Sequence, residues 1–256
     1  METIWDTIHI GAVRRSWTSL QRHLMNSLPD HLARQRIRAA ELSGGTSSRA
    51  ICQTVERVIS ENNLKGAILD YGAGIGELTR RLCKLGSFDR VVGADIMAAP
   101  RDFTEEAEWI QQDLNAAILN HDSEFDVVVA AEVIEHLENP RFMVRELYRL
   151  LRPGGTAIVS TPNNESWRSI LALLGRGHFV AFIENCYPAH ITALLRMDIT
   201  RIFLEAKFQS PRFYFTDYGG IPKSPSVTWQ RVSLGLLRGL RFSDNLIAMA
   251  RKPAES

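Results

Sequence analysis

Acidic side chains follow the short apolar stretches of this sequence, and they are the residues best placed to do chemistry. Asp70, Asp95, Asp113 and Glu132 each come at or just after the end of such a stretch. Carboxylates accept hydrogen bonds and attract positive charge. A group of them at one edge of a fold would therefore suit a ligand that carries hydroxyl groups or a cation.

Three glycines at alternate positions, Gly72, Gly74 and Gly76, follow the first of these acids. The apolar run before them and the leucines at helical spacing after them predict a strand, a tight turn and a helix. A dinucleotide-binding turn has the spacing G-x-G-x-x-G, whose third glycine would fall here at Glu77. Asp70, which lies just before the glycines, would also repel a pyrophosphate. The turn therefore indicates a cationic ligand rather than a dinucleotide.

The elements that position these residues alternate between strand and helix. A helix at about 47–62 precedes the first strand, and a helix at 197–206 precedes two closing strands at 212–215 and 246–251. This order predicts an α/β fold, a doubly wound, mostly parallel sheet with helices on both faces. Ligands of such sheets bind beyond the carboxyl ends of the strands, where the four acids are expected.

Two segments do not fit this alternation. Residues 1–46 contain two partly amphipathic stretches, which we interpret as a helical cap before a domain of residues 47–256. A dimer contact or a weak interfacial anchor would explain the same pattern. Residues 163–196 form an insertion after the fifth strand, and their aromatic-rich second half suggests a lid over the substrate.

Composition limits the possible partners. The chain has 256 residues, a formal net charge of +1 and three cysteines without C-x-x-C spacing, which fits a reducing, cytoplasmic location. No apolar run approaches the ~18 residues of a membrane span. The basic residues are scattered rather than interleaved with aromatic ones, which disfavours nucleic acid. The basic flanks of the acidic centre permit weak association with a membrane surface.

Four motifs together resemble the class I SAM-dependent methyltransferases: LDYGAGIG, VVGAD, FDVVVAAEVIEHLENP and LYRLLRPGGTAIVSTPN. They cover about 67–163. The resemblance is greatest to the branch that contains ubiquinone-biosynthesis O-methyltransferases and many sugar and natural-product O-methyltransferases. It implies a Rossmann-like sheet of seven strands with the last strand antiparallel. It also implies transfer of a methyl group from SAM to a small-molecule or glycan hydroxyl.

The resemblance assigns cofactor roles to positions that match the motifs. The glycine turn would line the methionine moiety, the acid of the second strand would hold the ribose, and the acid of the third would contact the adenine. For Asp113, a helix N-cap is an alternative explanation. The positions assigned to SAM are Asp70, Gly72, Ala73, Gly74, Asp95, Ile96, Asp113, Leu114 and Ala131.

Candidate bases and metal ligands follow the fourth strand. Glu132, Glu135 and His136 have the E-x-x-E-H spacing that in the ubiquinone O-methyltransferases is associated with a divalent metal, here magnesium or zinc. On a helical turn, Glu132 and His136 would lie one turn apart. An ion-paired helix end without metal explains the same spacing. His136 and His190 are the candidate bases for an acceptor proton, and His190 could instead simply begin a helix.

Other functions would share parts of this sequence pattern. A nucleobase methyltransferase would have an N/D-P-P-Y run after the fourth strand, where this chain has Ala131-Glu132-Val133-Ile134. N-methylation and carboxyl methylation use the same cofactor turn. A non-catalytic scaffold could also keep this fold, because a fold does not fix a function. The sequence identifies neither the acceptor nor an oligomeric state.

Overall fold

The computed structural model describes residues 30–103 and 106–254. The chain divides into two compact units, residues 1–38 and 39–256, and the sheet belongs to the second. Helix α2, Asp30–Ser43, crosses the boundary between them. Most of the expected cap, residues 1–29, lies outside the described part, so its role stays a prediction.

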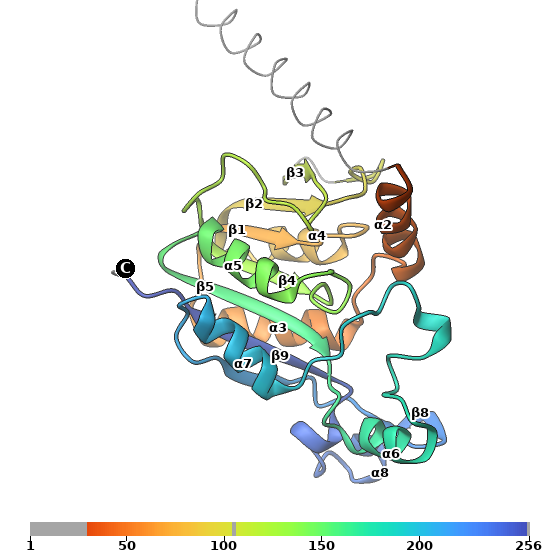
Figure 1. Cartoon of the computed structure of the whole chain (residues 1–256). Coiled ribbons are helices and arrows are strands. Elements are labelled where there is room, and N and C mark those ends of the chain that lie inside the picture. The colour runs from red at the N-terminus through yellow and green to blue at the C-terminus, as the bar shows by residue number, and fades with distance from the viewer. Residues whose placement is uncertain (1–29, 104–105, 255–256) are drawn as a thin grey trace, which may run out of the picture. The chain divides into compact units, whose positions relative to one another are not determined.

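A seven-stranded sheet forms the centre of the second unit (Figure 1). Its order is β3-β2-β1-β4-β5-β9-β6, and only β9 runs antiparallel to its neighbours β5 and β6. This confirms the expected mostly parallel sheet with an antiparallel last strand. The strands are β1 Gly66–Tyr71, β2 Phe88–Asp95, β3 Glu108–Gln111, β4 Phe125–Ala131, β5 Leu151–Pro162, β6 Arg212–Phe215 and β9 Asn245–Arg251.

The strands are buried on both faces because helices cover each side. Ile68 of β1 packs in one core with α3, Arg49–Glu61, and α4, Glu77–Lys84. Its neighbour Leu69 points to the opposite core, which contains the buried sides of α5, Pro140–Leu150, and α7, Arg196–Glu205. Successive side chains of a strand alternate in this way, so the near-continuous apolar runs of the sequence each serve two cores.

Polar caps set where the helices near the ligand edge begin. The Ser48 hydroxyl accepts from the amide of Ile51 at the start of α3, and the Ser166 hydroxyl accepts from Ser169 at the start of α6, Trp167–Arg176. Such side chains satisfy amides that have no partner within the helix. The caps place both helix starts at the carboxyl ends of the strands.

Three expected elements differ from the structure. The segment after β4, expected to begin as a helical turn, is a non-helical turn until α5 begins at Pro140. Strand β5 begins at Leu151, so 152–155 belong to the strand and do not form a separate loop. The connection between β6 and β9 contains short elements that the sequence did not indicate: β7 Gly220–Ile221, β8 Ser224–Thr228, α8 Trp229–Val232 and the 3-10 turn Leu240–Phe242.

The insertion after β5 contains α6 and a further 3-10 turn, Glu184–Cys186. Helix α6 ends at Arg176 and is capped by Gly177, whose positive φ is typical of a helix C-terminus. Figure 1 shows α6 close to the segment that carries β8 and α8, beyond the end of β5. Within the described ranges, no helix combines the length and apolar character that a bilayer crossing requires.

Candidate active site

Two of the predicted acids lie at the carboxyl edge of the sheet: Asp70 is one residue before the end of β1, and Asp95 ends the neighbouring strand β2. Asp70 is only 1% exposed, and the Thr79 hydroxyl of α4 donates to it over 2.6 Å. Burial raises the pKa of Asp70 to about 7, although the bond from Thr79 opposes the rise. Burial likewise raises the pKa of Asp95. Both carboxyl groups at this edge of the sheet are therefore buried from solvent.

The Asp95 carboxylate holds the glycine turn in shape. Its Oδ2 accepts from the amide of Gly74 over 2.8 Å, and its Oδ1 accepts from the amide of Met97 over 2.9 Å. The turn is tied to β2 as well, because the amides of Gly72 and Ala73 donate to the carbonyl of Ala94. These contacts fix the predicted residues Gly72, Ala73 and Gly74 beside Asp95.

Gly74 is required for a close approach that the sequence did not reveal. Its φ is +54°, and a Cβ at this position would lie 2.7 Å from the Gly45 Cα. The amide of Ile75 donates to the carbonyl of Gly45 over 3.0 Å. The segment before α3 thus packs directly on the turn, so the lack of a side chain at Gly74 first serves this backbone contact.

The third acid, Asp113, follows β3 and is 3% exposed. Its Oδ1 accepts from the backbone and side-chain amides of Asn115, which makes a local turn and no helix N-cap. The hydroxyl of Tyr71 donates to the carbonyl of Leu114 over 2.9 Å. Ile96 directly follows Asp95. The structure therefore brings the assigned ribose and adenine positions to the same edge as the glycine turn.

Strand β4 ends at Ala131, the last predicted cofactor position. The turn that follows begins with Glu132, whose backbone is strained. Glu132 has φ +57°, which is uncommon for a residue other than glycine. Its amide donates to the Ser160 hydroxyl over 2.9 Å, and its Oε1 accepts from the Asn245 side chain over 2.9 Å. Burial raises the pKa of Glu132 to about 7, with the bond from Asn245 opposing. Such strain is often held at functional sites.

The other candidate metal ligands and bases lie together without Glu132. Glu135, His136 and His190 each offer one ligand atom, and these atoms lie within 4.8 Å of one another. The rings of His136 and His190 are 4.7 Å apart between centroids. Burial, together with the charge of the nearby His190, lowers the pKa of His136 to about 4. The segment after β4 is not helical, so Glu132 does not lie one turn from His136. Glu132 instead accepts from Asn245 and is not part of the group formed by Glu135, His136 and His190.

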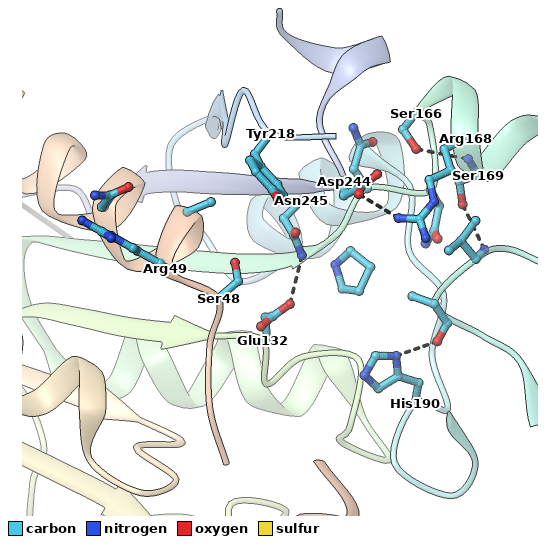
Figure 2. A pocket seen from close by; sticks show the side chains of 17 residues that line it. Ser48, Arg49, Glu132, Ser166, Arg168, Ser169, His190, Tyr218, Asp244 and Asn245 are labelled. Carbon is cyan, nitrogen blue, oxygen red and sulfur yellow. Dashed lines mark hydrogen bonds and ion pairs between the residues drawn. The ribbon is translucent and has the colours of Figure 1, made fainter. Parts of the chain in front are cut away.

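A cavity of about 610 Å³ opens beside Glu132 at the carboxyl ends of β4 and β5 (Figure 2). Glu132 and His190 both line it, whereas His136 does not. The ion pair of Arg168 and Asp244, with 2.7 Å between Nη1 and Oδ2, forms part of the wall. The lining includes many hydroxyl and amide side chains, namely Ser48, Gln53, Asn163, Asn164, Ser166, Ser169 and Asn245.

Several of these wall residues were not candidates in the sequence. Arg168, Asp244 and Asn245 are far apart along the chain, and they meet because α6 and the start of β9 lie together at the end of β5. Asn164 is 2% exposed, and its Oδ1 has no hydrogen-bond partner among the residues described. The one available signal was the Pro162-Asn163-Asn164 run directly after the fifth strand.

Sequence comparison identifies the family. Residues 43–209 match the methyltransferase domain family. The mitochondrial ubiquinone biosynthesis O-methyltransferase of Dictyostelium discoideum is 32% identical over 175 residues, which cover 62% of this chain and 53% of that protein. The Escherichia coli O9:H4 ubiquinone biosynthesis O-methyltransferase is 26% identical, with 46% and 52% covered. The chain thus spans about half the length of these curated relatives.

Solved structures agree on the fold. A Burkholderia thailandensis 1,6-didemethyltoxoflavin-N1-methyltransferase, solved with S-adenosylhomocysteine, has a TM-score of 0.57 at 17% identity, covering 88% of this chain and 91% of its own. A Thermotoga maritima SAM-dependent methyltransferase has a TM-score of 0.55 at 15% identity, covering 79% and 88%. Together with the match over 43–209, they show that this chain belongs to the methyltransferase domain family and has the class I SAM-dependent methyltransferase fold.

Proposed function

We propose that this protein transfers a methyl group from SAM to a hydroxyl of a small polar molecule. One observation carries the proposal: the acidic edge around the glycine turn and a cavity with amide and hydroxyl groups in its wall lie on either side of the turn that follows β4. Ala131 ends β4 on the cofactor side, and Glu132 lines the cavity. Two ligands bound there would meet at the end of β4.

The residues present fit SAM as the ligand of the acidic edge. For Asp70 and Asp95, the hydrogen-bond donors in the described part of the chain are neutral: a hydroxyl and backbone amides. Buried carboxylates without a cationic partner are costly. The positive charge of SAM would supply that partner near Asp70. Asp95 retains acceptor capacity for ribose hydroxyls, because its two oxygens together offer about four acceptor sites and the backbone amides do not use all of them.

The cavity supports an acceptor that carries a hydroxyl group. Its wall is mixed, because amide and hydroxyl side chains interrupt apolar surface, and the relatives named as O-methyltransferases act on an oxygen. The buried, unpartnered Oδ1 of Asn164 is an acceptor that a bound hydroxyl would satisfy. We therefore favour a sugar or glycan hydroxyl over a purely apolar acceptor. N-methylation and carboxyl methylation are outcomes that a product assay distinguishes.

The chain's own residues position the acceptor and receive its proton. When bound, SAM supplies an electrophilic methyl group on sulfur, and methyl transfer breaks the carbon–sulfur bond and leaves the electron pair on sulfur. The acceptor oxygen forms the new bond to carbon, and its proton passes to the Glu132 carboxylate. Asn245 holds this carboxylate through Oε1, and Glu132 lines the cavity in which the acceptor would bind. Holding the two reactants in line supplies much of the acceleration.

Calorimetry with SAM tests the cofactor half of the proposal. We expect Asp95→Asn to weaken SAM binding at least ten-fold, about 1.4 kcal/mol, because it removes the charge that accepts from the ribose and from the glycine turn. Asp89→Asn is the matched control, since Asp89 is an exposed acid at the other end of the same strand. No binding of millimolar SAM to the wild type would favour a non-catalytic scaffold instead.

A further inference from the structure

Three potential metal ligands come together from two separate segments of the chain. Glu135 and His136 lie on the turn after β4, and His190 lies near the end of the insertion that follows β5. One ligand atom of each lies within 4.8 Å of the other two. Zinc bonds of about 2.0–2.2 Å would require these atoms to draw together by on the order of an ångström, which side-chain rotation can supply.

Hydrogen bonds orient both imidazole rings. Nδ1 of His136 lies 2.8 Å from the carbonyl oxygen of Ala189, and Nδ1 of His190 lies 2.7 Å from that of Ala181. A carbonyl can only accept, so Nδ1 must carry the hydrogen in each ring. Nε2 is then left with its lone pair in both residues. Histidines that bind metals typically donate their other ring nitrogen to a carbonyl in this way.

Glu135 provides a second, independent indication of a ligand. The residue is 0% exposed, and neither carboxylate oxygen makes a hydrogen bond of normal geometry in the described part of the chain. The Thr161 hydroxyl, which likewise makes no such bond, lies beside this carboxyl group. A buried carboxyl group without partners is strongly unfavourable, so native structures rarely keep one without a function. A cation between Glu135 and the two rings would satisfy its oxygens and both free nitrogens together.

The set differs from the E-x-x-E-H set that the sequence suggests. Glu132 accepts from Asn245 and lines the acceptor cavity, so it does not join this group. We propose that Glu135, His136 and His190 bind one zinc-class divalent cation, which fastens the insertion to the turn after β4. Two imidazoles and one carboxylate suit zinc, cobalt or a similar metal, whereas magnesium prefers oxygen ligands.

The surrounding contacts show what the cation would hold in place. The amides of Ile191 and Thr192 already donate to the carbonyl of Glu135 over 3.0 and 3.1 Å. The ring centroids of Phe182 and His190 are 5.6 Å apart, so His190 also packs against the middle of the insertion. Metal binding would therefore stabilise one wall of the acceptor cavity, which Val180, Ala181 and His190 form.

Cobalt binding to the tag-free, full-length protein tests this site without an activity assay. After treatment with a chelator and its removal, Co²⁺ titration should give one equivalent of bound metal with a visible d–d absorption band. We expect His190→Gln and Glu135→Gln each to lower the affinity for Co²⁺ at least ten-fold. His178→Gln is the matched control, because His178 belongs to the same insertion and its Nδ1 contacts the carbonyl of its own neighbour, Phe179.

Limited proteolysis gives a second readout. Cleavage within 177–190 should slow on addition of Zn²⁺ in the wild type and in His178→Gln, but not in His190→Gln. The proposal is overturned if the wild type binds no stoichiometric Co²⁺, or if His178→Gln loses as much affinity as His190→Gln. An equal loss in Glu132→Gln would instead restore the E-x-x-E-H set. If Glu135→Gln fails to fold by circular dichroism, His190→Gln decides the result.

Discussion

At the scale of single residues, the choice of base depends on which side chains reach the acceptor cavity. Glu132 and His190 line it, and His136 lies behind it with its Nδ1 bonded to Ala189. Glu132 also lies next to Ala131, the position assigned to the cofactor, whereas His190 comes from the insertion. This places the carboxylate nearer to the expected meeting point of methyl donor and acceptor.

We therefore expect Glu132→Gln to lower kcat about 100-fold or more once an acceptor is known, with little change in SAM affinity, because general bases typically contribute 10²–10⁴-fold. Glu138→Gln is the matched control, since Glu138 is an exposed acid in the same turn. Near-full turnover in Glu132→Gln together with a comparable loss in His190→Gln would transfer the role to the histidine. Steady-state kinetics of product formation distinguishes these results.

How far these residues could be predicted depends on whether their position follows from local sequence. Asp70 and Asp95 were identifiable because each lies at or next to the end of an apolar strand, and parallel strands bring their ends to one edge. Asn245 and Arg168 were not, because they reach the cavity through the packing of α6 beside the start of β9. The partner of Glu132 also depended on the backbone φ of a single residue, which no spacing rule reveals.

At the scale of elements, strands were predictable and turns were not. Strand β6 matches the predicted bounds 212–215, and β9 begins one residue before the predicted 246–251, because buried strands have continuous apolar runs in the sequence. The E-x-x-E-H stretch fits a helical pattern as well, yet α5 begins only at Pro140, where Asn139 accepts from the Phe142 amide as N-cap. A proline fits best in the first turn of a helix, so the strong start signal lies after the acids.

The contact of the glycine turn with Gly45 leads to a prediction for this element. Gly74→Ala would place a Cβ against the Gly45 backbone, so we expect the segment before α3 to be displaced and SAM binding to fall. The matched control is Gly86→Ala, because Gly86 also has a positive φ but no atom within 4 Å of its added Cβ. Both variants should lose about 1–2 kcal/mol of stability from the left-handed conformation.

Gly74→Ala should lose additional stability in urea unfolding and at least ten-fold in SAM affinity by calorimetry, whereas Gly86→Ala should bind SAM like the wild type. If the two variants lose the same stability and both bind SAM normally, the contact with Gly45 does not hold the turn. The result also separates two explanations of the glycine at this position, which are space for the backbone of Gly45 and space for the methionine part of SAM.

At the scale of the whole molecule, the strand order places four acidic residues from different strands at one edge of the sheet. The order β3-β2-β1-β4 brings Asp70, Asp95, Asp113 and Glu132 to one edge of the sheet. Residues 67–163 carry 9 basic and 16 acidic residues, so the sequence already indicated an acidic centre. The sequence did not indicate how deeply these acids are buried, because burial depends on α4 and on the segment around Gly45 covering the edge.

This arrangement predicts how global stability changes with pH. The pKa of Asp70 is about 7 in the folded protein against 3.8 for an ordinary aspartate, chiefly because of burial. Between about pH 4 and 7 the folded state therefore holds a proton that the unfolded state releases. Under linkage, the contribution of Asp70 to the free energy of unfolding falls as pH rises through this window, by up to about 4 kcal/mol.

Urea unfolding at pH 5 and pH 8 checks this prediction. We expect the wild type to lose more stability over that range than Asp70→Asn, which has no proton to release, while Asp89→Asn behaves like the wild type. Saturating SAM should reduce the loss at pH 8, because its positive charge stabilises the ionised carboxylate and because it binds only the folded state. An Asp70→Asn variant with the same pH dependence as the wild type would show that Asp70 is ionised throughout, and the neutral partners described for it would then be incomplete.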